Sequence, residues 1–257
     1  MLRLTFAVLF SSLLSLTSQA ETFIIGAQNI QYYPHYDFSQ ENDKGLAWAI
    51  LEAYADQSGH ELIYHDMPIK RLQLEMRKGN VDFVYPDNPK WYNQIVPASE
   101  KYFSAPLTRA LGGTIVNPND VGKGIDRIQR LSIPLGFTPV NWQQRVDLKQ
   151  TRLVPVSDTL SALYLLKKDR VDAANLEYSV TQYLTLTSPQ YGPFTLDPAL
   201  PYDNVGFMLS TINHPAVLSD INTFIRTHGE LIDSLKQKYN LRDPEIILKE
   251  LRERFYP

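Results

Sequence analysis

The sequence predicts an α/β protein with two lobes, each a mostly parallel sheet flanked by helices. Two observations support this fold class. Short apolar runs alternate with amphipathic stretches from residue 22 onward, and the same alternation begins again near residue 130. Strands that alternate with helices pair in parallel, because each helix carries the chain back across the sheet. Two such units in tandem leave a cleft between them, and clefts of this kind are preferred ligand sites.

The first unit is expected to alternate three strands with two helices. Its strands are short apolar runs, and its helices carry apolar residues at helical spacing. Each helix is followed by a glycine, which ends helices readily because it tolerates a left-handed conformation. The expected strands are 22–27, 61–65 and 81–85, and the expected helices are 45–58 and 69–78.

The second unit repeats this order of elements. Its strands are expected at 130–135, 152–156 and 170–174. A helix is expected to start at Pro139 with Thr138 as its N-cap, since proline suits the first helical position and threonine the cap. A second helix should run to Lys168, capped by Ser157 or Asp158.

The first twenty residues are expected to be a secretory signal peptide that is cleaved after Ala20. Arg3 supplies the positive start, residues 4–16 form a mostly apolar run, and Ser18 and Ala20 are the small residues of a cleavage site. The run is shorter than the ~20 apolar residues that span a membrane comfortably. The alternative is an uncleaved anchor. The mature chain, 21–257, is therefore expected in the periplasm.

Composition argues against several classes of function. Lys and Arg number 25 against 28 Asp and Glu, and no basic patch stands out, so nucleic acid is not an expected partner. The chain has no cysteine, which removes thiol chemistry and cysteine metal sites, and its five histidines lack metal-ligand spacing. No metal or cofactor is expected. No Ser-His-Asp or paired-carboxylate arrangement can be argued, so no catalytic residue is assigned.

Four residues near these motifs are expected to be structural. Asp82 and Asp172 stand at the entry of buried strands, where an aspartate hydrogen-bonds backbone groups. Trp48, Trp91 and Trp142 could each be cleft aromatics, but Trp48 and Trp142 lie on expected helices and should pack in the interior.

Five segments of the chain form a pattern: YYPHYDF…KGLAWAILEAYA, GNVDFVYPDN, YFSAPL, KDRVDAANLEY and HPAVLSDINTFIRTHGELIDSLKQKY. Together they resemble the extracellular solute-binding proteins of family 3, the type II periplasmic receptors that bind polar amino acids for ABC transporters. The resemblance covers nearly the whole mature chain. Each motif is weak alone, and their order and spacing make the signal more specific.

The resemblance implies a type II periplasmic binding fold with a discontinuous first lobe. That lobe would comprise 21–110 and 205–257, and the second lobe 111–204. Two crossing strands near 109–116 and 203–209 would form the hinge. Glycines on these strands serve either hinge bending or close packing. They are Gly112, Gly113 and Gly206.

The resemblance also implies ligand contacts on the first lobe. An aromatic residue before proline faces the ligand in the family, and here Tyr32 or Tyr33 precedes Pro34. The ring could instead pack on the core. Tyr85 and Asn88 would hydrogen-bond the ligand, or else serve a turn beside proline.

One family feature is missing. The arginine that grips the ligand α-carboxylate has no counterpart in residues 87–94. Arg71 and Arg109 are the nearest substitutes, since a guanidinium fork fits a carboxylate. Each could equally belong to a surface ion pair.

On the second lobe, the resemblance implies that Gly136, Phe137 and Thr138 hold an anionic group at a helix N-terminus. Thr138 could instead be an ordinary helix cap. Glu177 stands where the family places the acid that pairs with a ligand ammonium. A buried carboxylate needs such a partner, although a protein lysine would also serve.

Together these features predict a monomeric receptor, not an enzyme. It would capture a small polar solute, an amino acid or related amine or carboxylate, and present it to an inner-membrane ABC permease. One alternative is a ligand-sensing module with a signalling partner. Another is a periplasmic dehydratase-like enzyme on the same fold, since fold alone does not decide function.

Overall fold

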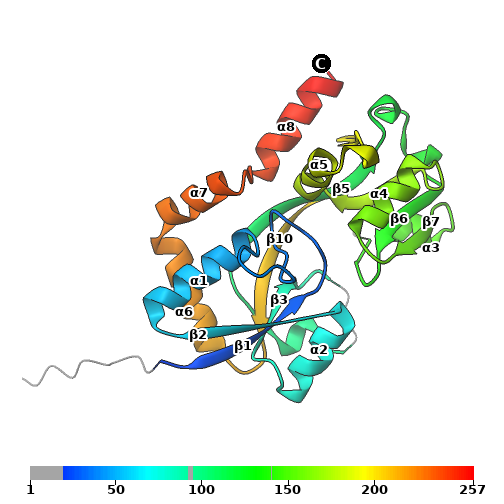
Figure 1. Cartoon of the computed structure of the whole chain (residues 1–257). Coiled ribbons are helices and arrows are strands. Elements are labelled where there is room, and N and C mark those ends of the chain that lie inside the picture. The colour runs from blue at the N-terminus through cyan, green and yellow to red at the C-terminus, as the bar shows by residue number, and fades with distance from the viewer. Residues whose placement is uncertain (1–19, 92–94, 140) are drawn as a thin grey trace, which may run out of the picture.

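The computed structural model describes residues 20–91, 95–139 and 141–257. Figure 1 shows two lobes joined by the long strands β5 and β10. We call the part built on β1, β2 and β3 the first lobe, and the part built on β6, β7 and β8 the second lobe. The continuous strand order is β2-β1-β3-β10-β5-β8-β6-β7. The α/β fold class expected from the sequence is confirmed.

In the first lobe, β1 pairs in parallel with both β2 and β3. Both helices end at a left-handed glycine, Gly59 with φ 76° and Gly79 with φ 74°, as expected from the sequence. The elements are β1 (Thr22–Gln28), α1 (Leu46–Ser58), β2 (Glu61–Met67), α2 (Ile69–Lys78) and β3 (Phe83–Asp87).

In the second lobe, β6 pairs in parallel with both β7 and β8. Asp158 caps α4 by accepting a hydrogen bond from the Ser161 N–H at 2.7 Å, so one of the two expected caps is correct. The elements are β6 (Arg130–Pro134), α3 (Gln143–Asp147), β7 (Arg152–Val156), α4 (Thr159–Lys167), β8 (Ala173–Glu177) and α5 (Tyr178–Thr187).

The crossing strands β5 (Thr108–Val116) and β10 (Tyr202–Thr211) form an antiparallel pair, with Gly206 opposite Arg109. On the first-lobe side, β10 pairs with β3 and with β4 (Tyr102–Phe103). On the second-lobe side, β5 pairs with β8 and with β9 (Thr195–Leu196). The pairing of β5 with β10 therefore joins the sheet of one lobe to the sheet of the other. Short 3-10 helices occur at Ala98–Glu100, Pro118–Asp120, Ile125–Arg127 and Pro189–Tyr191.

Three helices follow β10: α6 (Pro215–Thr227), α7 (Gly229–Lys238) and α8 (Pro244–Phe255). The helix α6 contacts β10 and β4, and α7 contacts α1, so both lie on the first lobe. In Figure 1, α8 leads from the end of α7 up to the C-terminus at the top of the view. Just after α8, the Tyr256 hydroxyl donates to Asp197 at 2.9 Å, so the end of the chain reaches the second-lobe side.

The four residues expected to be structural are confirmed as such. Asp82 accepts from the Ile24 N–H at 2.8 Å, and Asp172 accepts from the Arg130 N–H at 2.7 Å. Trp142 is fully buried, and its Nε1–H donates to Thr114 at 3.1 Å. Trp48 packs partly buried against the core. Across the described residues, no helix is both long and apolar enough to cross a membrane.

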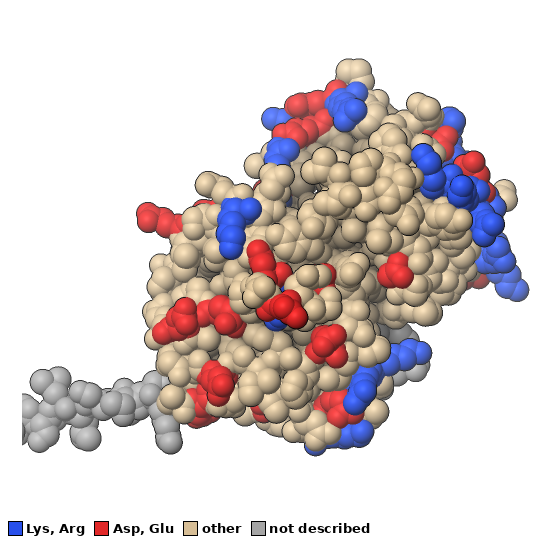
Figure 2. Space-filling view, viewed as in Figure 1, with Lys and Arg blue, Asp and Glu red and all other residues tan. Residues whose placement is uncertain are grey.

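Lys and Arg side chains gather along the outer edge of the second lobe, at the right of Figure 2. The sequence did not indicate this grouping, because its members come from separate elements. Several are paired with acids, as Arg130 is with Asp172 at 2.7 Å and Arg145 with Asp126 at 3.2 Å. Such pairing limits the net charge of this edge.

Candidate ligand-binding site

A cavity of about 100 Å³ lies where the lobes meet the crossing strands. The loop after β1, helix α2 and the end of β3 contribute its first-lobe wall. The turn after β6 and the end of β8 contribute its second-lobe wall, and β5 and β10 form the connecting wall. Its most prominent side chains are Tyr32, Trp91, Phe137, Asn175, Glu177 and Phe207.

Aromatic rings form much of this wall. Tyr32 of the first lobe meets Phe137 of the second edge to face, with ring centroids 5.7 Å apart. Phe207 on β10 lies 6.1 Å from Tyr32 and 5.9 Å from Trp91, centroid to centroid. The two lobes therefore touch through rings that also line the cavity. Offset and edge-on ring contacts of this kind are favourable.

Glu177 lies at the junction of β8 and α5, and its side chain is 2% exposed. One carboxylate oxygen accepts from the Val180 N–H at 2.6 Å and so caps α5. The other accepts from the Leu111 N–H of β5 at 3.1 Å. A buried carboxylate is costly unless donors surround it, and these two backbone groups meet part of that need. These two bonds hold the Glu177 carboxylate in place at the cavity wall.

His35 approaches Glu177 from the first lobe. Its ring is fully buried, and Nε2 lies 3.4 Å from a Glu177 carboxylate oxygen, within ion-pair distance. The orientation does not make this contact a hydrogen bond. The other ring nitrogen lies 3.3 Å from the Thr108 hydroxyl of β5. His35 thus connects the first-lobe loop, a crossing strand and the second lobe at one buried point.

The environment of Glu177 also affects Tyr32. Burial is the larger cause that raises the pKa of the Tyr32 phenol, and the negative charge of Glu177 raises it further. The phenol therefore remains protonated at neutral pH.

A buried ion pair supports the first-lobe wall. Lys101 Nζ lies 2.5 Å from an Asp87 carboxylate oxygen, and the two side chains are 2% and 5% exposed. Asp87 also accepts from the Ser210 hydroxyl at 2.7 Å and from the Asn88 N–H at 2.8 Å. These bonds hold Asp87 rigidly at the cavity edge. Among the described residues, no three His, Asp or Glu side chains are grouped to hold a metal ion.

Solved structures match this chain over most of its length, whereas no family model and no curated protein sequence matches it. A periplasmic binding protein of an arginine transport system from Legionella pneumophila is 15% identical with a TM-score of 0.67, over 86% of this chain and all of that one. A mutant BvgS VFT2 domain from Bordetella pertussis is 15% identical with a TM-score of 0.68, over 85% and 93%. A histidine kinase sensor domain is 14% identical with a TM-score of 0.67, over 85% and 95%.

The chain has the two-lobed periplasmic-binding-protein fold. The resemblance drawn from the sequence is thus confirmed at the level of the fold. In this fold the cavity lies at the place between the lobes where the sequence predicted a cleft. The matches do not by themselves assign a ligand, because proteins of one fold bind different molecules.

Five of the residues proposed from the sequence line the cavity of this periplasmic-binding-protein fold. They are Tyr32, Gly136, Phe137, Thr138 and Glu177. They come from both lobes, so the structure brings together residues that are separated by up to 145 positions in the chain.

Three other first-lobe residues lie outside that wall. Tyr33 packs against Tyr183 of α5, with centroids 4.7 Å apart. Tyr85 is fully buried in the core, 3.5 Å from the Thr108 hydroxyl. Asn88 donates to the Gly206 carbonyl at 2.8 Å, tying β3 to β10. Tyr85 was expected at the end of the third strand, but β3 continues to Asp87 and the Tyr85 side chain is buried in the core.

Neither arginine substitute lines the cavity. Arg71 points outward from α2 and pairs with Glu75 at 4.0 Å, with 67% of its side chain exposed, while the next residue, Leu72, faces inward. Arg109 is exposed on β5, and Ala110 faces the cavity instead, since successive strand residues point to opposite sides.

The turn after β6 differs from its expectation. The helix expected at Pro139 begins at Gln143, and its N-cap position is Trp142 without a side-chain bond. Asn141 has φ 64°, a left-handed conformation that is incompatible with a helix starting earlier. Gly136, Phe137 and Thr138 thus line the cavity as a turn and not as a helix N-terminus.

Packing explains two of the three glycines on the crossing strands. A Cβ atom on Gly113 would lie 2.5 Å from the Leu196 side chain, and one on Gly206 would lie 2.6 Å from Pro106. At Gly112 the nearest atom would be 3.8 Å away. Close packing therefore accounts for Gly113 and Gly206, and a hinge role is compatible with Gly112.

Proposed function

We propose that this protein is a periplasmic receptor that captures a small solute between its lobes by hinge closure. The observation that carries this proposal is a cavity whose walls come from both lobes and both crossing strands. A solute in such a cavity contacts both lobes at once and stabilises the closed arrangement. A ligand shifts a conformational equilibrium by its difference in affinity for the two states.

The proposed lobes follow the division expected from the sequence, with one refinement. Residues 21–110 form the first lobe together with 205–243, and residues 111–204 form the second. Helix α8 is assigned to the interface, because Tyr256 bonds to Asp197 and Arg252 donates to the Tyr202 hydroxyl at 2.8 Å. Bending would occur in β5 and β10, near Gly112.

The proposed cellular role is delivery of the solute to an inner-membrane ABC permease by a monomeric protein. The arginine transport protein of Legionella pneumophila, which shares the fold, supports this role. Export depends on the proposed signal peptide with cleavage after Ala20, which lies almost wholly outside the described residues. The solute is expected to leave unchanged, so no catalytic residue is proposed.

Ligand capture can be tested by thermal unfolding of mature protein that has been refolded to remove carried-over ligand. The panel comprises amino acids, amines, organic acids and sugars. A compound that binds the native state raises the melting temperature by mass action. If no compound in a broad panel changes the melting temperature, the receptor proposal fails.

Closure can be tested separately by distance measurement. The chain has no cysteine, so cysteines introduced at exposed Gln57 and Gln150 would carry two fluorophores, one on each lobe. A ligand found in the panel should shift the transfer efficiency between the labels. A hit that leaves the efficiency unchanged would argue for binding without hinge closure.

A sensing module is the second candidate. A histidine kinase sensor domain is among the structures that share the fold. The contact between His35 of the first lobe and Glu177 of the second also gives the closed arrangement a specific polar contact between the lobes. Uptake of the identified solute by cells lacking the gene separates the two roles, because only a transport receptor is needed for uptake.

A further inference from the structure

The charged side chains that line the cavity all have the same sign. Asp87, Glu177 and Asp203 contribute carboxylates to the wall, and no lysine or arginine of the described residues does so. The net charge that a ligand meets depends on which carboxylates have a cation beside them.

Two of the three carboxylates have a lysine partner. The Asp87–Lys101 pair is buried with atoms 2.5 Å apart, so the two charges largely cancel. Asp203 lies 3.7 Å from Lys90, whose side chain is 65% exposed, so solvent screens that contact. These pairs leave a weakly negative wall on the side of β3 and β10.

Glu177 is different, because its close partners are the backbone N–H groups of Leu111 and Val180 and the ring of His35. Backbone dipoles stabilise a carboxylate without cancelling its charge, and the His35 ring offsets that charge only when it is protonated. That charge acts inside the cavity, where together with burial it raises the pKa of the Tyr32 phenol. A positive charge placed in the cavity would be attracted to the same carboxylate.

The rings of the wall provide a second attraction for a cation. Tyr32, Phe137, Phe207 and Trp91 come from both lobes and from β10, with neighbouring centroids 5.7 to 6.1 Å apart. The face of an aromatic ring carries negative charge density and attracts cations, most strongly when water is excluded. Cations that water hydrates weakly give up the least hydration free energy on entering such a site.

We propose that the cavity selects a small organic monocation that carries no carboxylate, such as an alkylated ammonium. This inference rests on the proposed function, since it names the class of solute that the receptor captures. A free amino acid would bring its α-carboxylate among Asp87, Glu177 and Asp203, where the lining offers it no lysine or arginine. Repulsion would offset the attraction of its ammonium group.

The size of the cavity suggests suitable probes. A cavity of about 100 Å³ is somewhat smaller than the ~150 Å³ cavity that accepts one benzene molecule, so the site suits a ligand of few heavy atoms. Choline is a small probe with a trimethylammonium head. Its carbon analogue 3,3-dimethyl-1-butanol has the same shape without the charge, and glycine betaine keeps the head but adds a carboxylate. The three probes separate shape, positive charge and carboxylate.

Isothermal titration of the refolded mature protein with these probes tests the proposal. Choline is expected to bind at least tenfold more tightly than either 3,3-dimethyl-1-butanol or glycine betaine. Equal binding of choline and its neutral analogue would overturn the role of charge. Tighter binding of glycine betaine, or of any amino acid, would overturn the exclusion of carboxylates.

Variants connect the binding to the proposed groups. Glu177→Gln should weaken choline binding at least tenfold and change binding of the neutral analogue less than threefold. Because Glu177 also caps α5, Trp91→Leu serves as a second variant that leaves this cap in place, and it too should weaken choline at least tenfold. Glu253→Gln on the exposed face of α8 is the matched control and should leave binding unchanged.

The outcomes distinguish this inference from the function on which it rests. If amino acids bind and choline does not, the receptor stands and the cation proposal is wrong. If neither these probes nor the broad panel binds, both fail. Unchanged choline affinity in Glu177→Gln and Trp91→Leu, with both variants folded by circular dichroism, would place the ligand elsewhere.

Discussion

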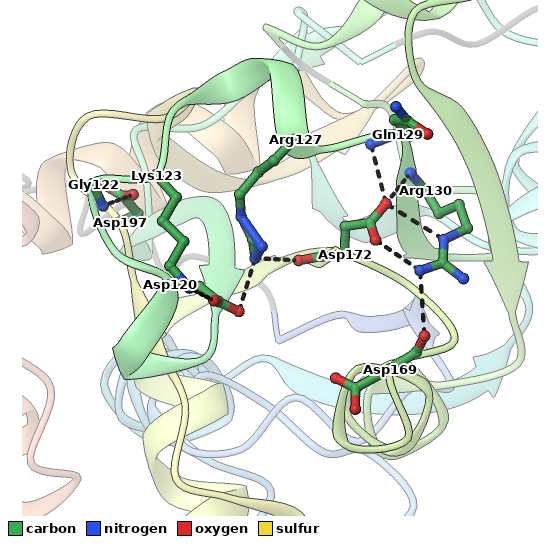
Figure 3. A network of polar contacts seen from close by, with 9 residues as sticks. All are labelled: Asp120, Gly122, Lys123, Arg127, Gln129, Arg130, Asp169, Asp172 and Asp197. Carbon is green, nitrogen blue, oxygen red and sulfur yellow. Dashed lines mark hydrogen bonds and ion pairs between the residues drawn. The ribbon is translucent and has the colours of Figure 1, made fainter.

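At the residue scale, Asp172 gathers several donors at the start of the second-lobe sheet (Figure 3). Its carboxylate accepts from the backbone N–H groups of Gln129 and Arg130 at 3.1 and 2.7 Å, and from the Arg130 guanidinium at 2.7 Å. Burial on its own would raise the pKa of Asp172, but the hydrogen bonds and charge of Arg130 outweigh it and lower the pKa below its usual value.

Asp172→Asn should therefore lower the free energy of unfolding by about 1–3 kcal/mol at neutral pH, the usual cost of breaking a hydrogen-bonded carboxylate. Because the folded-state pKa is depressed, the contribution is present above about pH 4 and disappears as the pH falls through the folded pKa. Urea unfolding at pH 7 and at pH 3 measures the difference in unfolding free energy between the unchanged protein and Asp172→Asn. This difference should be smaller at pH 3.

Asp169→Asn is the matched control for this prediction. Asp169 joins the same network through its backbone oxygen, which accepts from Arg130 at 3.3 Å (Figure 3). Its φ of 51° is tolerated by asparagine, so the substitution should cost little. An equal loss in the two variants would show that the Asp172 carboxylate has no special role.

The two adjacent glycines of β5 provide a second comparison at this scale. A Cβ on Gly113 would overlap the Leu196 side chain at 2.5 Å, whereas one on Gly112 meets nothing closer than 3.8 Å. Gly113→Ala should cost about 1–3 kcal/mol through overpacking. Gly112→Ala should leave stability nearly unchanged. Thermal unfolding of the two alanine variants tests this comparison. Similar melting temperatures would refute the packing role of Gly113.

At the scale of elements, α8 is held near the second lobe partly by the bond from Tyr256 to Asp197. Burial and, next, this bond raise the pKa of Tyr256 to about 12. A tyrosine whose pKa is raised by folding stabilises the protein below its unfolded pKa of about 10, and the stabilisation is lost as the pH rises toward 12.

Tyr256→Phe should accordingly reduce stability at pH 8 and flatten the alkaline loss of stability between pH 10 and 12. Chemical unfolding across this range measures both effects. Tyr102→Phe on the exposed strand β4 is the control, since its ring is 55% exposed. If the Tyr256 and Tyr102 variants lose stability equally at every pH, the bond to Asp197 does not anchor the end of the chain.

Most elements of both lobes could be predicted from the sequence because their signals are local. Alternating apolar runs and the glycines after α1 and α2 fix those elements without reference to the rest of the chain. Strands β3 and β8 begin two and three residues later than expected. Asp82 and Asp172 lie before these strands, and the carboxylate of each accepts a hydrogen bond from the backbone of a neighbouring strand. The late start of α3 depends on the conformation of Asn141, which its sequence context did not reveal.

At the scale of the whole molecule, the candidate site was predictable only in part. Glu177 and the turn from Gly136 to Thr138 followed from the family resemblance, and both line the cavity. The contact of His35 with Glu177 joins residues 142 positions apart, and no local pattern indicates it. Trp91 was a candidate cleft aromatic from the sequence, and it lines the cavity beside Phe207 of β10.

The crossing strands and α8 together predict that the two lobes unfold as one unit. β10 pairs with β3 of the first lobe, β5 pairs with β8 of the second, and β5 and β10 pair with each other, so the melting of either lobe would remove a hydrogen-bonding neighbour from this shared pair. Two single-tryptophan proteins test this, one retaining Trp48 of the first lobe and the other Trp142 of the second, with the remaining tryptophans changed to phenylalanine. Urea unfolding followed by fluorescence should give the same midpoint for both probes as far-ultraviolet circular dichroism of each protein. A separate, earlier transition at Trp142 would mean that the second lobe unfolds independently, and that the crossing strands act as a flexible linker instead of a shared core.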